Sequence, residues 1–265
     1  MTAGGGRARA KSSTPWLLTE PDPDARARVF CFPYSGCGAS MYSRWPTRRG
    51  DVEFLPLQFP YRENRTREPH FGTYEELADA LIPGIAPLLD RPYAFFGHCG
   101  GALPAYESAL RAEQLGLRPA DCLIASSQVV PHRGPHGRFL GLTTDELDQE
   151  IRTLLGRAGS TSIHEEIVEI VREILVADLD ANKQYSKPAP ARLSCRILAV
   201  GWDNDVEVRK ELMNAWPECA DDVEVIVLPG DHYTFLEGPE ALIEAIVQSC
   251  AAGVSQPMPA LRTTS

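Results

Sequence analysis

The sequence lacks any long apolar run: no stretch approaches the roughly 20 consecutive apolar residues that a membrane-spanning helix needs. It also lacks a basic excess, because 26 Lys and Arg face 36 Asp and Glu and give a formal net charge of -10. General binding to nucleic acid or to an anionic membrane is therefore not expected. The basic N-terminus has no apolar segment of the kind found in secretory signals, so we expect no such signal.

Paired cysteine spacings are absent as well. The seven cysteines are odd in number and include no C-x-x-C pair, which argues against a disulfide framework and against a zinc site. The chain also contains no P-loop and no dinucleotide fingerprint. We therefore expect reduced thiols, a cytoplasmic location, and no metal or cofactor bound by the chain itself.

Short β-rich segments alternate with helical patterns along the chain. This alternation predicts an α/β fold in which a mostly parallel sheet has helices on both faces. The predicted strands are 29–32, 52–57, 93–96, 123–126, 196–200 and 223–228. The predicted helices are 74–89, 101–114, 144–155, 163–180, 208–216 and 239–251.

One stretch interrupts the alternation, because two helices follow each other with no strand between them. Capping-box spacings, Thr143 with Glu146 and Ser162 with Glu165, open the two helices. We expect 130–190 to form a helical lid at the edge where open α/β sheets bind ligands. The lid belongs to a single predicted domain at 21–252, between a flexible leader at 1–20 and a flexible tail at 253–265.

Residues 95–101 read FFGHCGG, a G-x-nucleophile-x-G pattern with Cys99 at the position where serine usually stands. A strand-like run leads into it and a helix start made of small residues follows, which is the context that this motif requires. In a chain with 21 glycines the string alone would be a weak signal. In this context it predicts acyl transfer through a covalent intermediate on Cys99.

Two later segments supply a base and an acid. The last predicted strand runs into His232, and the strand before it runs into Asp203 and Asp205. Nucleophile, acid and histidine then follow in the chain order of α/β-hydrolases, each just past the carboxyl end of a strand. Spacing alone does not separate Asp203 from Asp205. We expect His98, inside the motif, to be a packed and hydrogen-bonded residue, because neighbours on a sharp turn point apart.

An oxyanion hole needs two backbone donors. One is predicted at the N–H of Gly100, directly after Cys99, and the other in the loop after the first strand. That loop reads FPYSGCGAS at 32–40, and its glycines allow a close approach to a reacting carbonyl. The candidate there is the N–H of Ser35, and the alternative is a plain glycine-rich turn.

Four segments resemble the type II (external, editing) thioesterases of polyketide and nonribosomal peptide pathways. They are FCFPYSG at 30–36, LQFPYR at 57–62 with Arg65, PYAFFGH at 92–98, and the stretch from 177–185 through Gly201 to 230–232. The resemblance spans about residues 29–250. It implies an α/β-hydrolase fold with a flexible helical lid and, from the family's spacing, Asp205 as the acid. The implied substrates are acyl groups on the phosphopantetheine of acyl or peptidyl carrier proteins.

The chain departs from that family at Cys99, where serine is usual, and at Gly100, where a bulkier residue is usual. An acyl group on cysteine is itself a thioester, so its exchange with a second thiol is nearly isoenergetic. The cysteine resembles that of the aminoacyl shuttles of coronamic acid and syringomycin assembly. We expect hydrolytic release or editing in secondary-metabolite biosynthesis, with acyl or aminoacyl transfer between two carrier proteins as the alternative.

Two further hypotheses stay open: another cysteine α/β-hydrolase, such as a dienelactone-hydrolase-like enzyme, and a carrier-binding protein without catalysis. A carrier protein is usually acidic, like this chain, so docking would need a local basic patch. We predict that Arg62, Arg65 and Arg67 contact the carrier or its phosphate. The alternative is a set of solvated loop arginines, with Arg62 in a structural role.

Overall fold

The computed structural model describes residue 12 and residues 14–254. Its seven-stranded sheet has the order β2-β3-β1-β4-β5-β6-β7, and every neighbouring pair is parallel except β2 with β3. The strands are β1 (Ala27–Phe32), β2 (Arg48–Arg49), β3 (Val52–Pro56), β4 (Tyr93–His98), β5 (Cys122–Ser126), β6 (Arg196–Trp202) and β7 (Val223–Leu228). The six predicted strands are confirmed. Sequence analysis missed β2, because two residues are too short for any periodicity.

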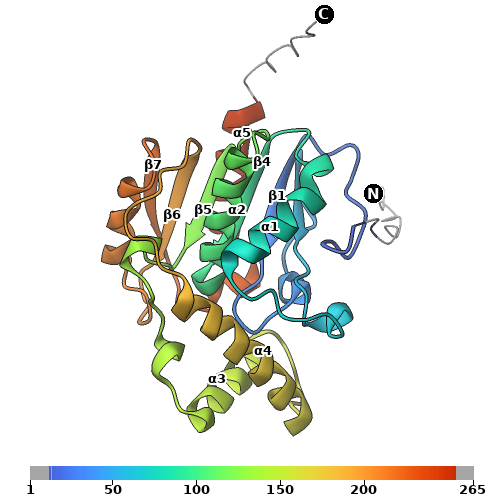
Figure 1. Ribbon diagram of the computed structural model, residues 1–265, viewed down its shortest axis with the longest axis vertical. Coiled ribbons are helices and arrows are strands. Elements are labelled where there is room, and N and C mark those ends of the chain that lie inside the picture. Colours follow the sequence, from blue (N-terminus) through green and yellow to red (C-terminus); the bar gives the residue numbers. More distant parts are fainter. Residues whose placement is uncertain (1–11, 13, 255–265) are drawn as a thin grey trace, which may run out of the picture.

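Helices cover both faces of the sheet, as predicted (Figure 1). Helices α1 (Tyr74–Ile85) and α2 (Ala102–Gln114) pack on one face, and α5 (Glu240–Val254) packs on the other. Successive strand residues point to opposite faces: Phe30 and Phe95 face the first layer, whereas Cys31 and Phe96 face α5. The central strands are therefore buried on both sides, and only their ends are left to carry a site.

The predicted lid contains two consecutive helices, α3 (Thr144–Arg157) and α4 (Glu165–Gln184), which lie together beyond one end of the sheet (Figure 1). Thr143 and Glu146 form the expected capping box. The second capping box is wrong, because α4 begins after His164 without a side-chain cap. The predicted helix at 208–216 is a 3₁₀ helix at Lys210–Glu218. Within the described residues, no helix combines the length and the apolarity that crossing a membrane would take.

The predicted flexible ends need two corrections. Residues 253 and 254 of the predicted tail at 253–265 belong to α5, whereas residues 255–265, 1–11 and 13 lie outside the described part of the chain. Residues 14–20, however, belong to the folded domain: Trp16 and Leu17 are buried, and Leu17 forms an antiparallel bridge with Leu57. The Arg65 guanidinium lies over the Trp16 ring, 4.5 Å from its centroid. Isolated apolar residues in a polar leader carry no periodic signal, so the sequence did not indicate this packing.

Candidate active site

Cys99 stands on a sharp turn between β4 and α2. Its φ of 48° lies in the left-handed region, a conformation that costs a non-glycine residue free energy. Residues in such strained conformations cluster at functional sites. The turn is tight enough that a Cβ on Gly97 would overlap the backbone carbonyl of Gly101. This strand–turn–helix geometry is that of a nucleophile elbow, which presents the side chain at the end of the sheet.

His232 connects Cys99 to Asp205. The Nδ1 atom of His232 lies 2.9 Å from Oδ2 of Asp205. Cys99 also interacts with His232 and raises the pKa of its imidazole, and the nitrogen left for it is Nε2 because Nδ1 is bonded to Asp205. Asp203 instead accepts a hydrogen bond from the Gly230 amide at 2.8 Å. Of the two aspartates that spacing left open, the structure thus brings Asp205 to the histidine.

The Asp205 carboxylate has partners on both oxygens. Oδ1 accepts the amides of Glu207 at 2.8 Å and Val208 at 3.0 Å, and Oδ2 accepts the Ser127 hydroxyl at 2.7 Å as well as His232. Burial alone would raise the pKa of Asp205, but these hydrogen bonds and the charge of His232 hold it well below its usual range. Asp205 is therefore ionised at neutral pH and fixes the tautomer and orientation of the imidazole.

The environment of His232 favours the imidazolium. Burial lowers the pKa of His232, but its hydrogen bonds to Asp205 and Cys99 outweigh that effect and raise the pKa to about 10. His98, the neighbour of Cys99, behaves in the opposite way: burial and the nearby charge of His232 hold its pKa well below the usual value. His98 is bonded to Ser126 at 2.9 Å and stacks on Phe235, which is the packed role expected for it.

The loop after β1 lies directly over the elbow. Its Ser35 hydroxyl occupies the place that a Cβ on Gly100 would take. Within the described hydrogen bonds, the amides of Gly36 and Cys37 donate to Asp178 and to Tyr34, whereas the Ser35 amide has no acceptor. Ser35 and Gly100 are thus adjacent, as an oxyanion hole requires, and the small residue after Cys99 is explained by the serine above it.

A buried ion pair joins this loop to the lid. Arg62 is 1% exposed and donates two hydrogen bonds to Asp178 of α4, at 2.7 and 2.9 Å. It also donates to the Cys37 carbonyl at 3.0 Å. Asp178 in turn accepts the Gly36 amide at 2.8 Å and lies 2.8 Å from Nε2 of His70. The Arg62–Asp178 pair therefore couples the position of α4 to the geometry of the loop after β1, which carries Ser35.

The predicted carrier contacts at Arg62 and Arg65 are wrong, because neither side chain is accessible. Arg62 is committed to Asp178, and Arg65 is 9% exposed, pairs with Glu68 and donates to the Gln58 carbonyl at 2.9 Å. The structural role held open for Arg62 is the one found. Arg67 is exposed, so it is the one member of the predicted patch that a partner can reach.

A cavity of about 20 Å³ lies beside Cys99, which is room for roughly one water molecule. Its lining combines Ser35 and Gly100 of the elbow region with Asn182 of α4 and with Glu207. An open groove of about 350 Å³ adjoins it, and the two share residues 136–138, Leu140 and Glu207 as a common wall. A ligand larger than a few atoms therefore enters only if this wall or the lid moves.

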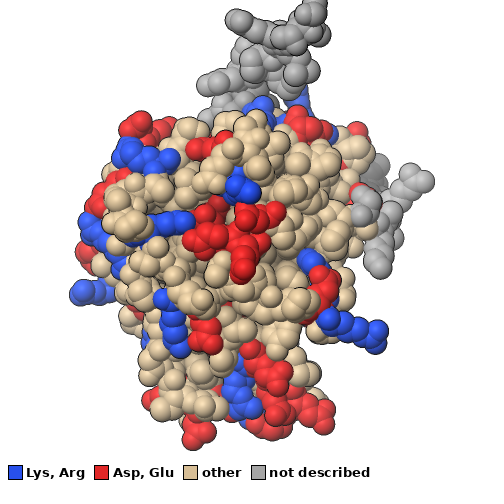
Figure 2. Space-filling view, viewed as in Figure 1, with Lys and Arg blue, Asp and Glu red and all other residues tan. Residues whose placement is uncertain are grey.

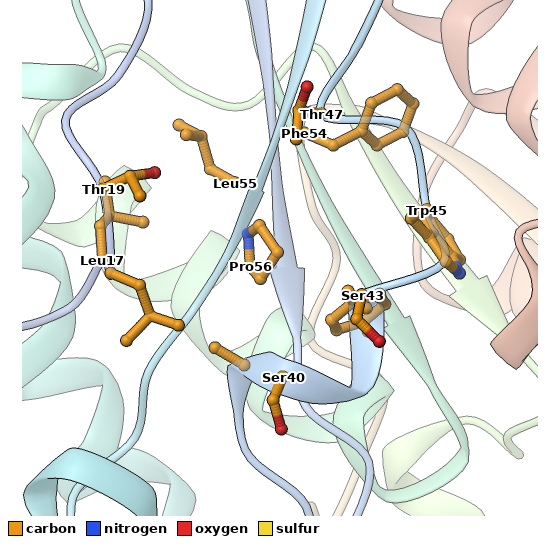
Figure 3. A pocket seen from close by; sticks show the side chains of 12 residues that line it. Leu17, Thr19, Ser40, Ser43, Trp45, Thr47, Phe54, Leu55 and Pro56 are labelled. Atoms are coloured by element: carbon orange, nitrogen blue, oxygen red, sulfur yellow. The ribbon is translucent and has the colours of Figure 1, made fainter. Parts of the chain in front are cut away.

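Another hollow, of about 260 Å³, lies away from this site between residues 17–19, the turn at 39–45 and β3 (Figure 3). Trp45 and Phe54 contribute to its apolar lining, and none of the three residues Cys99, Asp205 and His232 takes part. Among the described residues, no Asp, Glu, His, Lys, Arg or Cys lines it, so it holds none of the acid, base and thiol groups that gather beside Cys99.

Sequence reasoning missed three side chains at the site. Ser127 supports Asp205, and the Tyr34 hydroxyl and Glu207 Oε2 each lie 3.5 Å from Nε2 of His232. Ser127 directly follows β5, so its place at the carboxyl end of a strand was a usable signal. Tyr34 and Glu207 stand in loops whose course the sequence does not specify, and Glu207 resembles any other surface glutamate.

A family model described as a thioesterase domain matches residues 27–250. Two relatives are the linear gramicidin dehydrogenase LgrE of Brevibacillus parabrevis and the gramicidin S biosynthesis protein GrsT of Aneurinibacillus migulanus. LgrE is 32% identical over 90% of this chain and 93% of its own, and GrsT is 30% identical over 83% and 87%. Among solved structures, the thioesterase RedJ from the prodiginine pathway of Streptomyces coelicolor superposes with a TM-score of 0.75 at 29% identity. That match covers 88% of this chain and 93% of RedJ.

Proposed function

Because the chain belongs to the thioesterase family, we propose that it acts on acyl or aminoacyl thioesters of carrier-protein phosphopantetheine through an acyl group on Cys99. The chain is a thioesterase of the α/β-hydrolase fold, and its type II relatives work in secondary metabolism. The observation that carries the finer proposal is the connected set of Cys99, His232 and Asp205 at the elbow. The relatives act in biosynthetic pathways, and this supports carrier proteins as the proposed substrates and partners.

The first step is attack of the Cys99 thiolate on the thioester carbonyl. The thiol proton passes to Nε2 of His232, whose imidazolium is stabilised by Asp205, and the thiolate is the nucleophilic form. The carbonyl oxygen becomes an oxyanion that accepts hydrogen bonds from the amides of Ser35 and Gly100. The carbon–sulfur bond to phosphopantetheine then breaks, the proton on Nε2 of His232 passes to the leaving thiolate, and the acyl group remains on Cys99.

The second step needs the opposite behaviour from His232. After the proton has left, the imidazole is neutral and Cys99 carries no charge, so a group that raised the pKa of His232 is gone. His232 can then accept a proton from the attacking nucleophile as general base. Water gives the free acid, which is release or editing. The thiol of a second carrier gives a new thioester, which is transfer.

A cysteine nucleophile makes carrier-to-carrier transfer a second candidate beside hydrolysis. Hydrolysis of acyl-Cys99 is downhill and is the activity of the family. Exchange between two thioesters is close to balanced in free energy, and a thiolate attacks a thioester more readily than water does. We therefore propose hydrolysis as the main reaction and carrier-to-carrier transfer as the alternative, both in the cytoplasm, where carrier thiols and Cys99 stay reduced.

Intact-protein mass spectrometry with an acyl-loaded carrier and an unloaded second carrier tests the proposal. We expect the acyl mass on the wild-type enzyme but not on Cys99→Ala. Free acid accumulating while the second carrier stays empty identifies a hydrolase. Label that reaches the second carrier before free acid forms identifies a transferase. Turnover of the loaded carrier by Cys99→Ala at the wild-type rate would contradict both.

Carrier docking must overcome a general repulsion. Figure 2 shows acidic side chains gathered near the middle of the face that carries α1 and α2, with basic side chains dispersed around it. Arg67 is the accessible basic residue that we retain as a carrier contact. Arg67→Glu should raise KM for a carrier-bound substrate and leave KM for a free pantetheine thioester unchanged.

A further inference from the structure

Glu207 is a buried carboxylate at the active site that the triad chemistry does not use. Its side chain is 4% exposed and lines the cavity beside Cys99. One oxygen, Oε1, lies 3.3 Å from the Arg138 guanidinium. The other, Oε2, lies 3.5 Å from Nε2 of His232, longer than a normal hydrogen bond. Among the described residues, this second oxygen therefore has no donor at normal hydrogen-bond distance.

The charges around Glu207 leave a negative excess. Arg138 is the one Lys or Arg side chain that lines the cavity, and it is already engaged by Glu150 through two hydrogen bonds, at 2.8 and 2.6 Å. Glu150 and Glu207 thus share a single guanidinium. The imidazolium of His232, 3.5 Å from Oε2, is shared with Asp205, so Arg138 and His232 bring two positive charges against the three carboxylates of Glu150, Glu207 and Asp205.

A second buried polar side chain lines the same cavity from the lid, and it also interacts with Tyr74. Asn182 of α4 is 4% exposed and lines the cavity, and its Oδ1 is buried without a hydrogen-bond partner among the described residues. Buried polar atoms in native proteins are normally paired, so such an atom calls for a donor. His136 Nε2 is also buried, unpartnered and part of the lining, and it accepts when the ring carries its proton on Nδ1.

We propose that Glu207 is a specificity-determining residue that selects acyl groups with a protonated amine on the first or second carbon from the thioester carbonyl. This inference rests on the proposed acylation of Cys99. An ammonium group offers three donors and one positive charge, which match Glu207 Oε2, Asn182 Oδ1 and the local negative excess. Because Oε2 lies 3.5 Å from Nε2 of His232 and Glu207 lines the same cavity as Cys99, a group close to the carbonyl can reach it.

Two pantetheine thioesters of nearly equal shape provide the test. Alanyl-pantetheine carries an ammonium group where isobutyryl-pantetheine carries a methyl group. Acylation of Cys99 is followed by intact mass at about pH 6.5, below the roughly 7.7–8.0 at which α-amino groups titrate. We expect the wild-type enzyme to prefer the alanyl thioester, and we expect the alanyl-to-isobutyryl rate ratio to fall at least tenfold in Glu207→Gln.

Controls separate recognition from other effects. Glu207→Met, of similar volume, should lose the preference as Glu207→Gln does, and thermal unfolding reports whether each variant is folded. Glu211→Gln removes the same charge from an exposed position and should keep the wild-type ratio. A ratio that stays at the wild-type value in both Glu207 variants, or a wild-type preference for isobutyryl, overturns this inference and leaves the proposed function standing. If neither thioester nor a loaded carrier acylates Cys99, the proposed function itself fails, and the inference fails with it.

Discussion

Replacing Arg62 with alanine should destabilise the whole domain rather than weaken the docking of a partner. Arg62 is 1% exposed and makes two hydrogen bonds to Asp178, which is itself 4% exposed. Removing one member of a buried pair leaves the other charge without compensation, at a cost of about 3–5 kcal/mol. For a domain of this size, 1 kcal/mol corresponds to about 2–4 °C in Tm, so Tm should fall by roughly 6–20 °C.

The pH dependence of this loss has a definite sign. Burial would raise the pKa of Asp178, but Arg62, His70 and the Gly36 amide lower it to about 2. A depressed carboxyl pKa stabilises the fold above the unfolded value of 3.8, and this stabilisation is lost as the pH falls toward 2. In Arg62→Ala the Asp178 carboxyl can take up a proton instead. The difference in unfolding free energy between wild type and variant should therefore be largest near pH 7 and shrink below about pH 4.

A double variant separates stability from activity. Arg62→Met with Asp178→Leu replaces the ion pair by apolar side chains, a change that is often neutral or stabilising in buried sites. Most of the lost Tm should return. The Gly36 amide would still lack its acceptor, so the neighbouring Ser35 amide would be less well held and kcat should stay below that of the wild type.

The assay is thermal unfolding by circular dichroism together with kcat and KM on a loaded carrier. Arg67→Ala is the matched control: its side chain is exposed, and its Tm should change by no more than about 2 °C. A Tm for Arg62→Ala within about 3 °C of the wild type, combined with a raised KM for the carrier, would refute the burial argument and restore a docking role for Arg62.

Two further predictions concern the triad and the loop after β1. Asp205→Asn should lower kcat at least about 10²-fold, because the imidazole loses its orienting acceptor. The raised pKa of His232 stabilises the fold fully below pH 6.5, and this stabilisation is lost as the pH rises through about 10. Asp205→Asn should therefore lower the unfolding free energy most below pH 6.5, and the difference from wild type should shrink toward pH 10. Chemical denaturation at a series of pH values measures this difference. Gly100→Ala should lower kcat because its Cβ overlaps the Ser35 hydroxyl, and adding Ser35→Ala should restore part of the lost activity; a Gly100→Ala enzyme with wild-type kcat would contradict the overlap.

The sheet and the elbow could be predicted because their signals are local. Strands β1 and β4 have apolar runs of strand length, and the motif at Cys99 needs only a few residues of context. Asp205 and His232 could be placed beside Cys99 because parallel strands bring their carboxyl ends to one edge, even though the residues are far apart in sequence. The order of parallel strands therefore predicted a proximity that the spacing of the three residues in the sequence does not indicate.

The burial of Arg62 and Arg65 could not be predicted from the sequence. Arg62, Arg65 and Arg67 lie close together in the sequence, a pattern that usually indicates an exposed basic patch. The partner of Arg62 lies 116 positions away on a lid helix, and the cation–π partner of Arg65 lies in the expected leader. Burial of a charge depends on whether a distant segment folds back to pair with it, and hydrophobic periodicity contains no information on that pairing.

The two buried carboxylates near the site differ in how completely they are paired, and this difference distinguishes a structural charge from one available to a ligand. Asp178 accepts hydrogen bonds from Arg62 and Gly36 and contacts His70, all within 2.9 Å. Among the described residues, Glu207 has only contacts of 3.3 Å and 3.5 Å, although its side chain is just as deeply buried. A buried charge with weak partners costs free energy in the unliganded protein. A cationic substrate recovers that cost on binding, so selectivity for charge can be built into the site without any change in the fold.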